Sequence, residues 1–285
     1  MKLKAVFVAA VALFSAGSIN ASTSIGVTPA IKGVVNADTK IELIKEGFTG
    51  TEGPITLPDG SFIFTETPAN RITRINPDDS ISTFLDNSNG SNGLAFSASG
   101  DLYSVQVLNP RIGIVYPSEK AKVLVDQFEG KPFGRPNDIV LDKQGRIYFT
   151  DSGSPNPAEN QRTAVNKPAV YRVTQNGSIQ RIANDIERPN GIQLSPDERV
   201  LYVANTWGEH ILAYDINADG SVGPRRNFAK LDGFRKTDTG YSSGADGLAV
   251  DAEGVSMWPP QLVFRSSLTA VKNSALSPYL SHLKT

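Results

Sequence analysis

The sequence contains no cysteine and only two histidines among its 285 residues. Without thiols it can form neither a disulfide framework nor a thiolate site, whatever its compartment. His210 and His282 are too far apart in the chain to make a zinc-binding motif. Stability must therefore come from packing, with or without a bound metal.

The chain also lacks an excess of charge of either sign, because 28 Lys and Arg face 29 Asp and Glu. No basic field is present to attract nucleic acid or an anionic membrane, so a polyanionic partner is not expected. Helical periodicity is absent after residue 21, which leaves an α/β fold without its helices. An apolar fraction of 39% is enough for a sizeable core. We therefore predict an all-β protein.

Residues 1–21 are typical of a secretory signal. Lys2 and Lys4 give a basic start, an apolar stretch runs from Ala5 to Ala16, and Ala21 is a plausible cleavage residue. The alternative is a membrane anchor, but the apolar run is well short of the ~20 residues that span a bilayer. We expect an exported protein, periplasmic or secreted, with no integral membrane segment once the signal is removed.

Five segments share one pattern: a polar opening residue, a short apolar strand, a turn rich in Asp, Gly and Pro, and a β-branched or aromatic strand. The opening residues are Glu52, Asn92, Asn137, Asn190 and Asp246. Each segment is typical of a β-hairpin. The openers lie about 40 to 56 residues apart, close to or somewhat above the ~40–50 residues of a four-stranded propeller blade. The pattern predicts a β-propeller.

In a propeller the first strands of all blades run along the central axis in the same direction, so the five openers should form a ring at one mouth. Two carboxylates and several amide oxygens suit Ca²⁺, Mg²⁺ or Mn²⁺. The alternative is that Asn-Gly and Asp-Gly are only turn dipeptides. For Asn92 the turn interpretation is as good as the metal-binding one. It is weaker for the whole set, because Glu52 is a poor turn residue and Asn137 precedes Asp rather than Gly.

Four motifs carry a family resemblance: Thr51-Glu52-Gly53-Pro54, Arg135-Pro136-Asn137-Asp138, Arg188-Pro189-Asn190-Gly191-Ile192 and Ala245-Asp246-Gly247-Leu248. On these, the chain from about Ile41 to Gly254 resembles the family that joins gluconolactonases, senescence marker protein (regucalcin) and luciferin-regenerating enzyme. The resemblance implies a six-bladed β-propeller and divalent-metal-dependent hydrolysis of lactones or related esters.

The resemblance also implies roles for the openers. The expected metal ligands are Glu52, Asn137, Asn190 and Asp246. Asn137 is alternatively a substrate contact, together with Arg135 and Asn92, and Asp246 is also the candidate catalytic base. We expect one divalent cation, with calcium as the first candidate and magnesium, manganese or zinc as alternatives. The expected partner is a small lactone or ester.

Three further features bear on function. The rival to an enzyme is a non-catalytic propeller that binds a small ligand or a protein at its mouth, since fold alone does not separate the two.

The segment Gly240–Gly244 matches the G-x-S-x-G pattern of serine hydrolases, but no helix follows it and Ser242 is not expected to be a nucleophile. The long polar segments Asp151–Pro168 and Gly233–Gly244 are predicted to border the mouth.

The repeat stops after Gly254, so we assign residues 22–254 to the propeller and 255–285 to an aberrant tail. Pro259 and Pro260 cannot occupy a central strand, because each lacks the ladder N–H. Ser256–Ser267 can be encoded so that the same bases, from the third base of the Ser256 codon, read Tyr-Val-Ala-Thr-Ala-Ala-Gly-Val-Gln-Ile-Phe, a strand, a turn and a strand. We hypothesise that a one-base slip near Val255 left the C-terminal blade incomplete, with little for Ala37–Gly47 to pair with.

This hypothesis predicts that the chain as written folds poorly or is inactive, whereas a frame-restored chain is stable and active. The expected difference arises because unpaired sheet edges replace a closed ring. Thermal unfolding and metal-dependent lactonase rates of the two chains check it. Equal stability and equal rates, or DNA resequencing that finds the frame intact with matching transcripts, would contradict it.

Overall fold

A computed structural model describes residues 23–28, 30, 36–154, 165–174, 176–231, 233–238, 240–250, 256–257 and 271–272. Within these ranges the only helix is the 3₁₀ turn η1 (Ser118–Lys120), and all other regular structure is β-strand. None of the helical structure there has the length and apolar character required to cross a bilayer. The prediction of an all-β fold is confirmed.

The main body consists of four sheets, each made of four strands that are consecutive in the chain and antiparallel. Sheet 1 is β3 (Thr51–Thr56), β4 (Phe62–Glu66), β5 (Arg71–Ile75) and β6 (Ile81–Asp86). Sheet 2 is β7 (Ser91–Phe96), β8 (Leu102–Gln106), β9 (Arg111–Tyr116) and β10 (Lys122–Val125). Sheet 3 is β13 (Pro136–Leu141), β14 (Ile147–Asp151), β15 (Ala169–Val173) and β16 (Ile179–Ala183). Sheet 4 is β17 (Pro189–Leu194), β18 (Val200–Asn205), β19 (His210–Asp215) and β20 (Arg226–Lys230).

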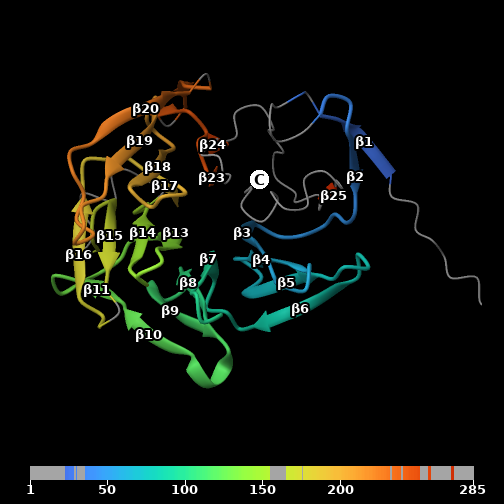
Figure 1. The fold of residues 1–285 in the computed structure, drawn as a ribbon, viewed down its shortest axis with the longest axis horizontal. Helices are drawn as coiled ribbons and strands as arrows, with labels where there is room; N and C mark the ends of the chain where they lie inside the picture. Colours follow the sequence, from blue (N-terminus) through green and yellow to red (C-terminus); the bar gives the residue numbers. More distant parts are fainter. Residues whose placement is uncertain are drawn as a thin grey trace, which may run out of the picture.

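The four sheets are arranged around a common centre, as propeller blades are (Figure 1). The first strand of each sheet lies nearest the centre and the fourth lies at the periphery. Four of the five predicted hairpins are therefore the inner half of a sheet. The fifth begins after Asp246, where β23 (Ala249–Val250) pairs with β24 (Ser256–Met257).

Three smaller sheets complete the described structure. Two are hairpins: β11 (Gln127–Phe128) with β12 (Lys131–Pro132), and β21 (Arg235–Thr237) with β22 (Gly240–Ser242). The third contains β1 (Thr23–Val27), β2 (Lys40–Leu43) and β25 (Val271–Lys272). The expectation that Ala37–Gly47 has little to pair with is therefore wrong, because β2 is hydrogen-bonded on both sides. The predicted signal and most of the predicted aberrant tail lie outside the described residues.

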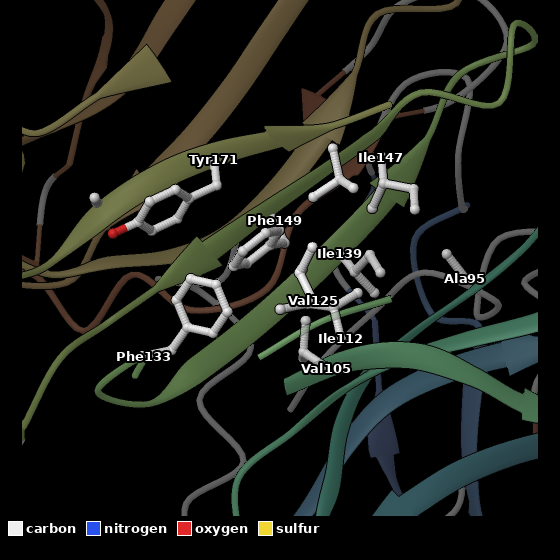
Figure 2. Close-up of a cluster of buried hydrophobic side chains, with 11 residues drawn as sticks. Ala95, Val105, Ile112, Val125, Phe133, Ile139, Ile147, Phe149 and Tyr171 are labelled. Carbon is white, nitrogen blue, oxygen red and sulfur yellow. The ribbon is translucent and has the colours of Figure 1, made fainter. Parts of the chain in front are cut away.

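Each pair of neighbouring sheets encloses its own apolar cluster, because alternate residues of a strand face opposite sides of its sheet. In β14, Ile147 and Phe149 pack towards sheet 2, whereas Tyr148 packs towards sheet 4. Figure 2 shows the cluster between sheets 2 and 3, where Phe133, Phe149 and Tyr171 lie together. Their ring centroids are 5.1 to 5.3 Å apart. The sheets are thus held face to face by apolar contact.

Every inner strand carries a β-bulge at the same place. Between the paired residues at each end, two residues of the first strand oppose one of the second at Glu52–Ile55, Ser91–Leu94, Pro136–Ile139 and Pro189–Ile192. The predicted openers lie within or at the edge of these bulges. A bulge interrupts the ladder and changes the direction in which a side chain points, so the repeated opener coincides with a repeated break in pairing.

Glycines behind the openers allow the inner strands to approach closely. A Cβ added to Gly93 would lie 2.5 Å from Asp138 Oδ1, and one added to Gly191 would lie 2.3 Å from the carbonyl oxygen of Asp246. No side chain fits in that space. The Asn-Gly pairs of the repeat are therefore packing requirements of adjacent strands, in addition to any role in turns.

We predict that Gly191→Ala lowers the free energy of unfolding by about 1–3 kcal/mol, because the new methyl group forces the backbone at Asp246 to move. The matched control is Gly223→Ala, whose added Cβ would meet its nearest atom, the Asp215 carbonyl oxygen, at 3.7 Å. Urea unfolding of both variants measures the effect. Equal stability of the two variants would show that the inner strands can separate without cost.

Candidate functional site

The first three openers are linked in order by hydrogen bonds at the centre of the molecule. Thr65 Oγ1, on β4, lies 3.0 Å from the carbonyl oxygen of Glu52 and 2.9 Å from that of Asn92. Asn92 Nδ2 donates to the carbonyl oxygen of Asn137 at 2.8 Å. Sheets 1, 2 and 3 are thus joined at the register of the openers.

The chain of contacts continues through sheet 4. Thr150 Oγ1 donates to the carbonyl oxygen of Asn190 at 2.6 Å. Thr206 Oγ1 accepts from Asn190 Nδ2 at 3.2 Å and donates to the carbonyl oxygen of Ala245 at 2.7 Å. The N–H of Gly191 donates to the carbonyl oxygen of Asp246 at 3.1 Å. The described contacts therefore link the segments that carry the five openers in chain order.

Two amide oxygens in this arrangement lack a partner within the described part of the chain. Asn137 Oδ1 and Asn190 Oδ1 are both buried and accept no hydrogen bond there. Asn190 is oriented so that its amide nitrogen is used by Thr206, which leaves the oxygen for something else. A buried polar atom without a partner in a native protein calls for an explanation, such as an absent ion or water.

Carboxylate oxygens accompany the two amides. Glu52 Oε2 and Asp246 Oδ1 are also buried atoms that accept no hydrogen bond among the described residues, although both residues make other interactions. The described residues contain no group of three or more His, Cys, Asp or Glu side chains placed to hold a metal. A cation here would therefore depend on amide oxygens as well as carboxylates, a donor set that fits a hard divalent ion.

Asn92 differs from the other openers. It is fully buried, and both ends of its amide are used internally: Nδ2 donates to the Asn137 carbonyl oxygen, and Oδ1 accepts from Thr67 Oγ1 at 3.1 Å. This amide therefore links sheets 1, 2 and 3. A substrate contact by Asn92 stays a prediction.

Two arginines lie at the same end of adjacent inner strands, Arg135 before β13 and Arg188 before β17. The side chain of Arg135 is exposed. The guanidinium of Arg188 lies 4.9 Å from the ring centroid of Trp207, and its Nη1 donates to the carbonyl oxygen of Ser154 at 3.3 Å. Burial lowers the pKa of Arg188, the charge of Arg135 lowers it further, and the charge of Asp246 acts in the opposite direction. The three charges therefore influence one another.

Sequence reasoning selected Arg135 but not Arg188 or Trp207. The signal for Arg188 was available, because Arg-Pro-Asn occurs twice, at Arg135 and at Arg188, each time ending in an opener. Trp207 has no such signal, since it lies in a loop and reaches the site only through the fold. The G-x-S-x-G segment is on hairpin strand β22, where Ser242 Oγ donates to the carbonyl oxygen of Thr206.

A set of buried polar residues missed by sequence reasoning ends the second strand of each sheet. These corner residues are Glu66, Gln106, Asp151 and Asn205. Each holds the segment that leads into the first strand of its own sheet. Asp151 accepts from the backbone N–H groups of Gly134, Arg135 and Gly153, and Asn205 Oδ1 accepts from that of Arg188. The corner residues thus fix the backbone that carries both site arginines.

Comparison with known proteins identifies the relatives of this chain. The sequence model described as "SMP-30/Gluconolactonase/LRE-like region" matches residues 34–262. A gluconolactonase of Zymomonas mobilis is 32% identical over 248 residues, covering 80% of this chain and 69% of that protein. Among solved structures, a gluconolactonase of Xanthomonas campestris gives a TM-score of 0.65 at 25% identity, over 84% of this chain and 79% of that one. A calcium-binding regucalcin of Agrobacterium tumefaciens gives 0.60 at 16% identity, over 82% and 70%, and shows the fold alone.

The corner residues of sheets 3 and 1 respond to pH in opposite directions. Burial raises the pKa of Asp151 from 3.8 to about 6, against the opposing effect of its three N–H donors. Burial also acts to raise the pKa of Glu66. There, however, hydrogen bonds from Arg71, Thr73 and the Thr49 N–H, with the charge of Arg71, outweigh burial and leave the pKa below 4.5.

We predict opposite pH dependences for two variants. Asp151 binds its proton more tightly in the folded chain, so its stabilising contribution is present below pH 3.8 and is lost as the pH rises to about 6, by about 3 kcal/mol. The stability advantage of the wild type over Asp151→Asn should fall between pH 3.5 and 7, whereas its advantage over Glu66→Gln should rise. Urea unfolding across this range tests both. Parallel profiles for the two variants would refute the assignment.

Proposed function

We propose, on the premise that the chain belongs to the SMP-30/gluconolactonase/LRE-like family, that it hydrolyses lactones or related esters with the help of one divalent cation. The cation would be held by Glu52, Asn137, Asn190 and Asp246. The observation that carries the proposal is the pair of buried amide oxygens, Asn137 Oδ1 and Asn190 Oδ1, which accept no hydrogen bond within the described part of the chain. The similarity to gluconolactonases supplies the substrate class.

The donor set favours calcium over zinc. All four side chains offer oxygen, and neither imidazole nor thiolate is among them. Oxygen ligands suit Ca²⁺, Mg²⁺ and Mn²⁺, whereas zinc sites are rich in nitrogen and sulfur. The two formal charges of Glu52 and Asp246 equal that of a dication, which fits a single ion rather than a pair.

The chain's own residues supply the remaining chemistry. When bound, a divalent cation polarises a carbonyl and stabilises negative charge on its oxygen. Asp246 takes a proton from the water whose oxygen adds to the lactone carbonyl carbon. The ring C–O bond then breaks, and the proton is transferred to the departing ring oxygen. Arg135 orients the substrate from the exposed side of the site.

The number of blades and the location of the protein are part of the same proposal. We propose six blades with the C-terminal one incomplete, and export of the protein to the periplasm or the medium. The four complete sheets and their similarity to gluconolactonase structures support a propeller of this kind. The near balance of 28 basic and 29 acidic residues supports a small-molecule partner over a nucleic acid.

We predict that removal of the cation by chelator abolishes hydrolysis of D-glucono-1,5-lactone, and that Ca²⁺ or Mn²⁺ restores it. Asn190→Ala and Asp246→Ala should each lower kcat by at least about 100-fold, because each removes a ligand. Glu119→Gln, which alters an exposed carboxylate on η1, is the control and should keep full activity.

Direct binding provides a readout apart from activity. Calorimetric titration with CaCl2 and elemental analysis of the purified chain should show one cation in the wild type and in Glu119→Gln, and weaker binding in Asn190→Ala. Cation binding without hydrolysis of any lactone would favour the non-catalytic propeller instead. Hydrolysis that persists in chelator would remove the metal mechanism.

A further inference from the structure

The two Arg-Pro-Asn motifs place two guanidinium groups at one end of neighbouring inner strands. Arg135 precedes β13 and Arg188 precedes β17, each two residues before an opener. Ser152, which follows β14, ties the two segments together at this end: its N–H donates to the carbonyl oxygen of Arg135 at 3.0 Å, and its Oγ donates to that of Pro189 at 2.6 Å. The Arg188 side chain also contacts the segment that follows β14 of sheet 3, through its hydrogen bond to the Ser154 carbonyl oxygen.

These two arginines differ from most others in the described part of the chain. Seven arginines there form salt bridges with carboxylates: Arg71, Arg74, Arg146, Arg181, Arg199, Arg225 and Arg226. Neither Arg135 nor Arg188 has such a bridge with a described residue. The charge of Asp246 favours the charged form of Arg188, but neither arginine forms an ion pair with a described carboxylate as the other seven do.

The backbone is held at both arginines, and at Arg188 the guanidinium is held as well. The corner residues Asp151 and Asn205 accept hydrogen bonds from their backbone N–H groups, at 2.6 and 3.2 Å. Trp207 supports the Arg188 guanidinium from one face at 4.9 Å. The charge of Arg135 disfavours the charged form of Arg188, and an anion bound beside the two guanidinium groups would relieve this repulsion. Carboxylate and phosphate oxygens match the donor geometry of guanidinium groups.

We propose that Arg135 and Arg188 form a subsite for an anionic substituent of the substrate, a carboxylate or a phosphate, next to the openers. That the bound anion belongs to a substrate rests on the proposed function. Anion binding itself depends only on the two arginines. The preferred lactone thus carries a negative charge outside its ring. Arg188 binds the anion while Trp207 and Ser154 keep its guanidinium oriented.

Matched lactone pairs test this preference on the full chain. D-Glucaro-1,4-lactone differs from D-glucono-1,4-lactone by a carboxylate, and 6-phospho-D-glucono-1,5-lactone differs from D-glucono-1,5-lactone by a phosphate. In one of the two pairs, the wild type should show a kcat/KM at least tenfold higher for the charged lactone than for the neutral one. The pair that shows this preference identifies the recognised anion as a carboxylate or a phosphate. Arg188→Gln should reduce that ratio to near one while changing the neutral lactone less than threefold. Arg226→Gln, in an exposed salt bridge, is the control.

Equal use of charged and neutral lactones by the wild type would overturn the inference, as would an equal loss on both in Arg188→Gln. In the second case the arginine would position the lactone ring rather than recognise an anion.

Binding of inorganic phosphate separates this inference from the proposed function. The chain has two tryptophans, so Trp258→Phe leaves Trp207 as the only indole fluorophore. Phosphate should change its fluorescence, with at least tenfold weaker binding when Arg188→Gln is added. Such binding without hydrolysis of any lactone would refute the enzyme and support the subsite. Hydrolysis of lactones without charge preference and without phosphate binding would support the enzyme and refute the subsite.

Discussion

The constraint on which the structure depends is the close approach of the inner strands at the openers. There a hydroxyl or amide from one sheet bonds to the backbone carbonyl of the next, as Thr65 does with Asn92 and Thr150 with Asn190. Glycine must follow the opener where backbones come this close. Apolar clusters hold the sheets face to face farther out, but only polar atoms can fill the bulged, interrupted ladder at the centre. The polar centre is therefore a consequence of how the sheets converge.

A centre of this kind supplies binding groups. Each bulge frees a side chain from the alternation of its strand, and neighbouring bulges are joined by hydrogen bonds. Where a neighbour satisfies the amide, as in Asn92, the residue is part of the framework. Where the amide oxygen accepts nothing among the described residues, as in Asn137 and Asn190, it is a candidate ligand. One repeated position thus serves two purposes, according to its surroundings.

The corner residues connect the framework to the substrate side. Asp151 and Asn205 hold the backbone at Arg135 and Arg188, so the placement of both guanidinium groups depends on buried polar atoms behind them. Asp151 is fully buried, and burial raises its pKa to about 6, which couples this support to pH. Loops at the end of the sheets add Trp207 and Ser154. The positively charged side of the site is therefore built from three elements that are distant in the chain.

The sequence by itself determined the repeat, the all-β class, four of the hairpins and the openers, because strand alternation and turn residues are local signals. It also contained the second Arg-Pro-Asn motif. Only the tertiary structure decided that Asn92 is internally bonded, whereas the amide oxygens of Asn137 and Asn190 accept no hydrogen bond from the residues that the structure describes. It also decided that Trp207 supports Arg188 and that β2 pairs with β25. The physical reason is that a side chain's hydrogen-bond partners lie on neighbouring sheets, and no local pattern specifies which partner a given amide will meet.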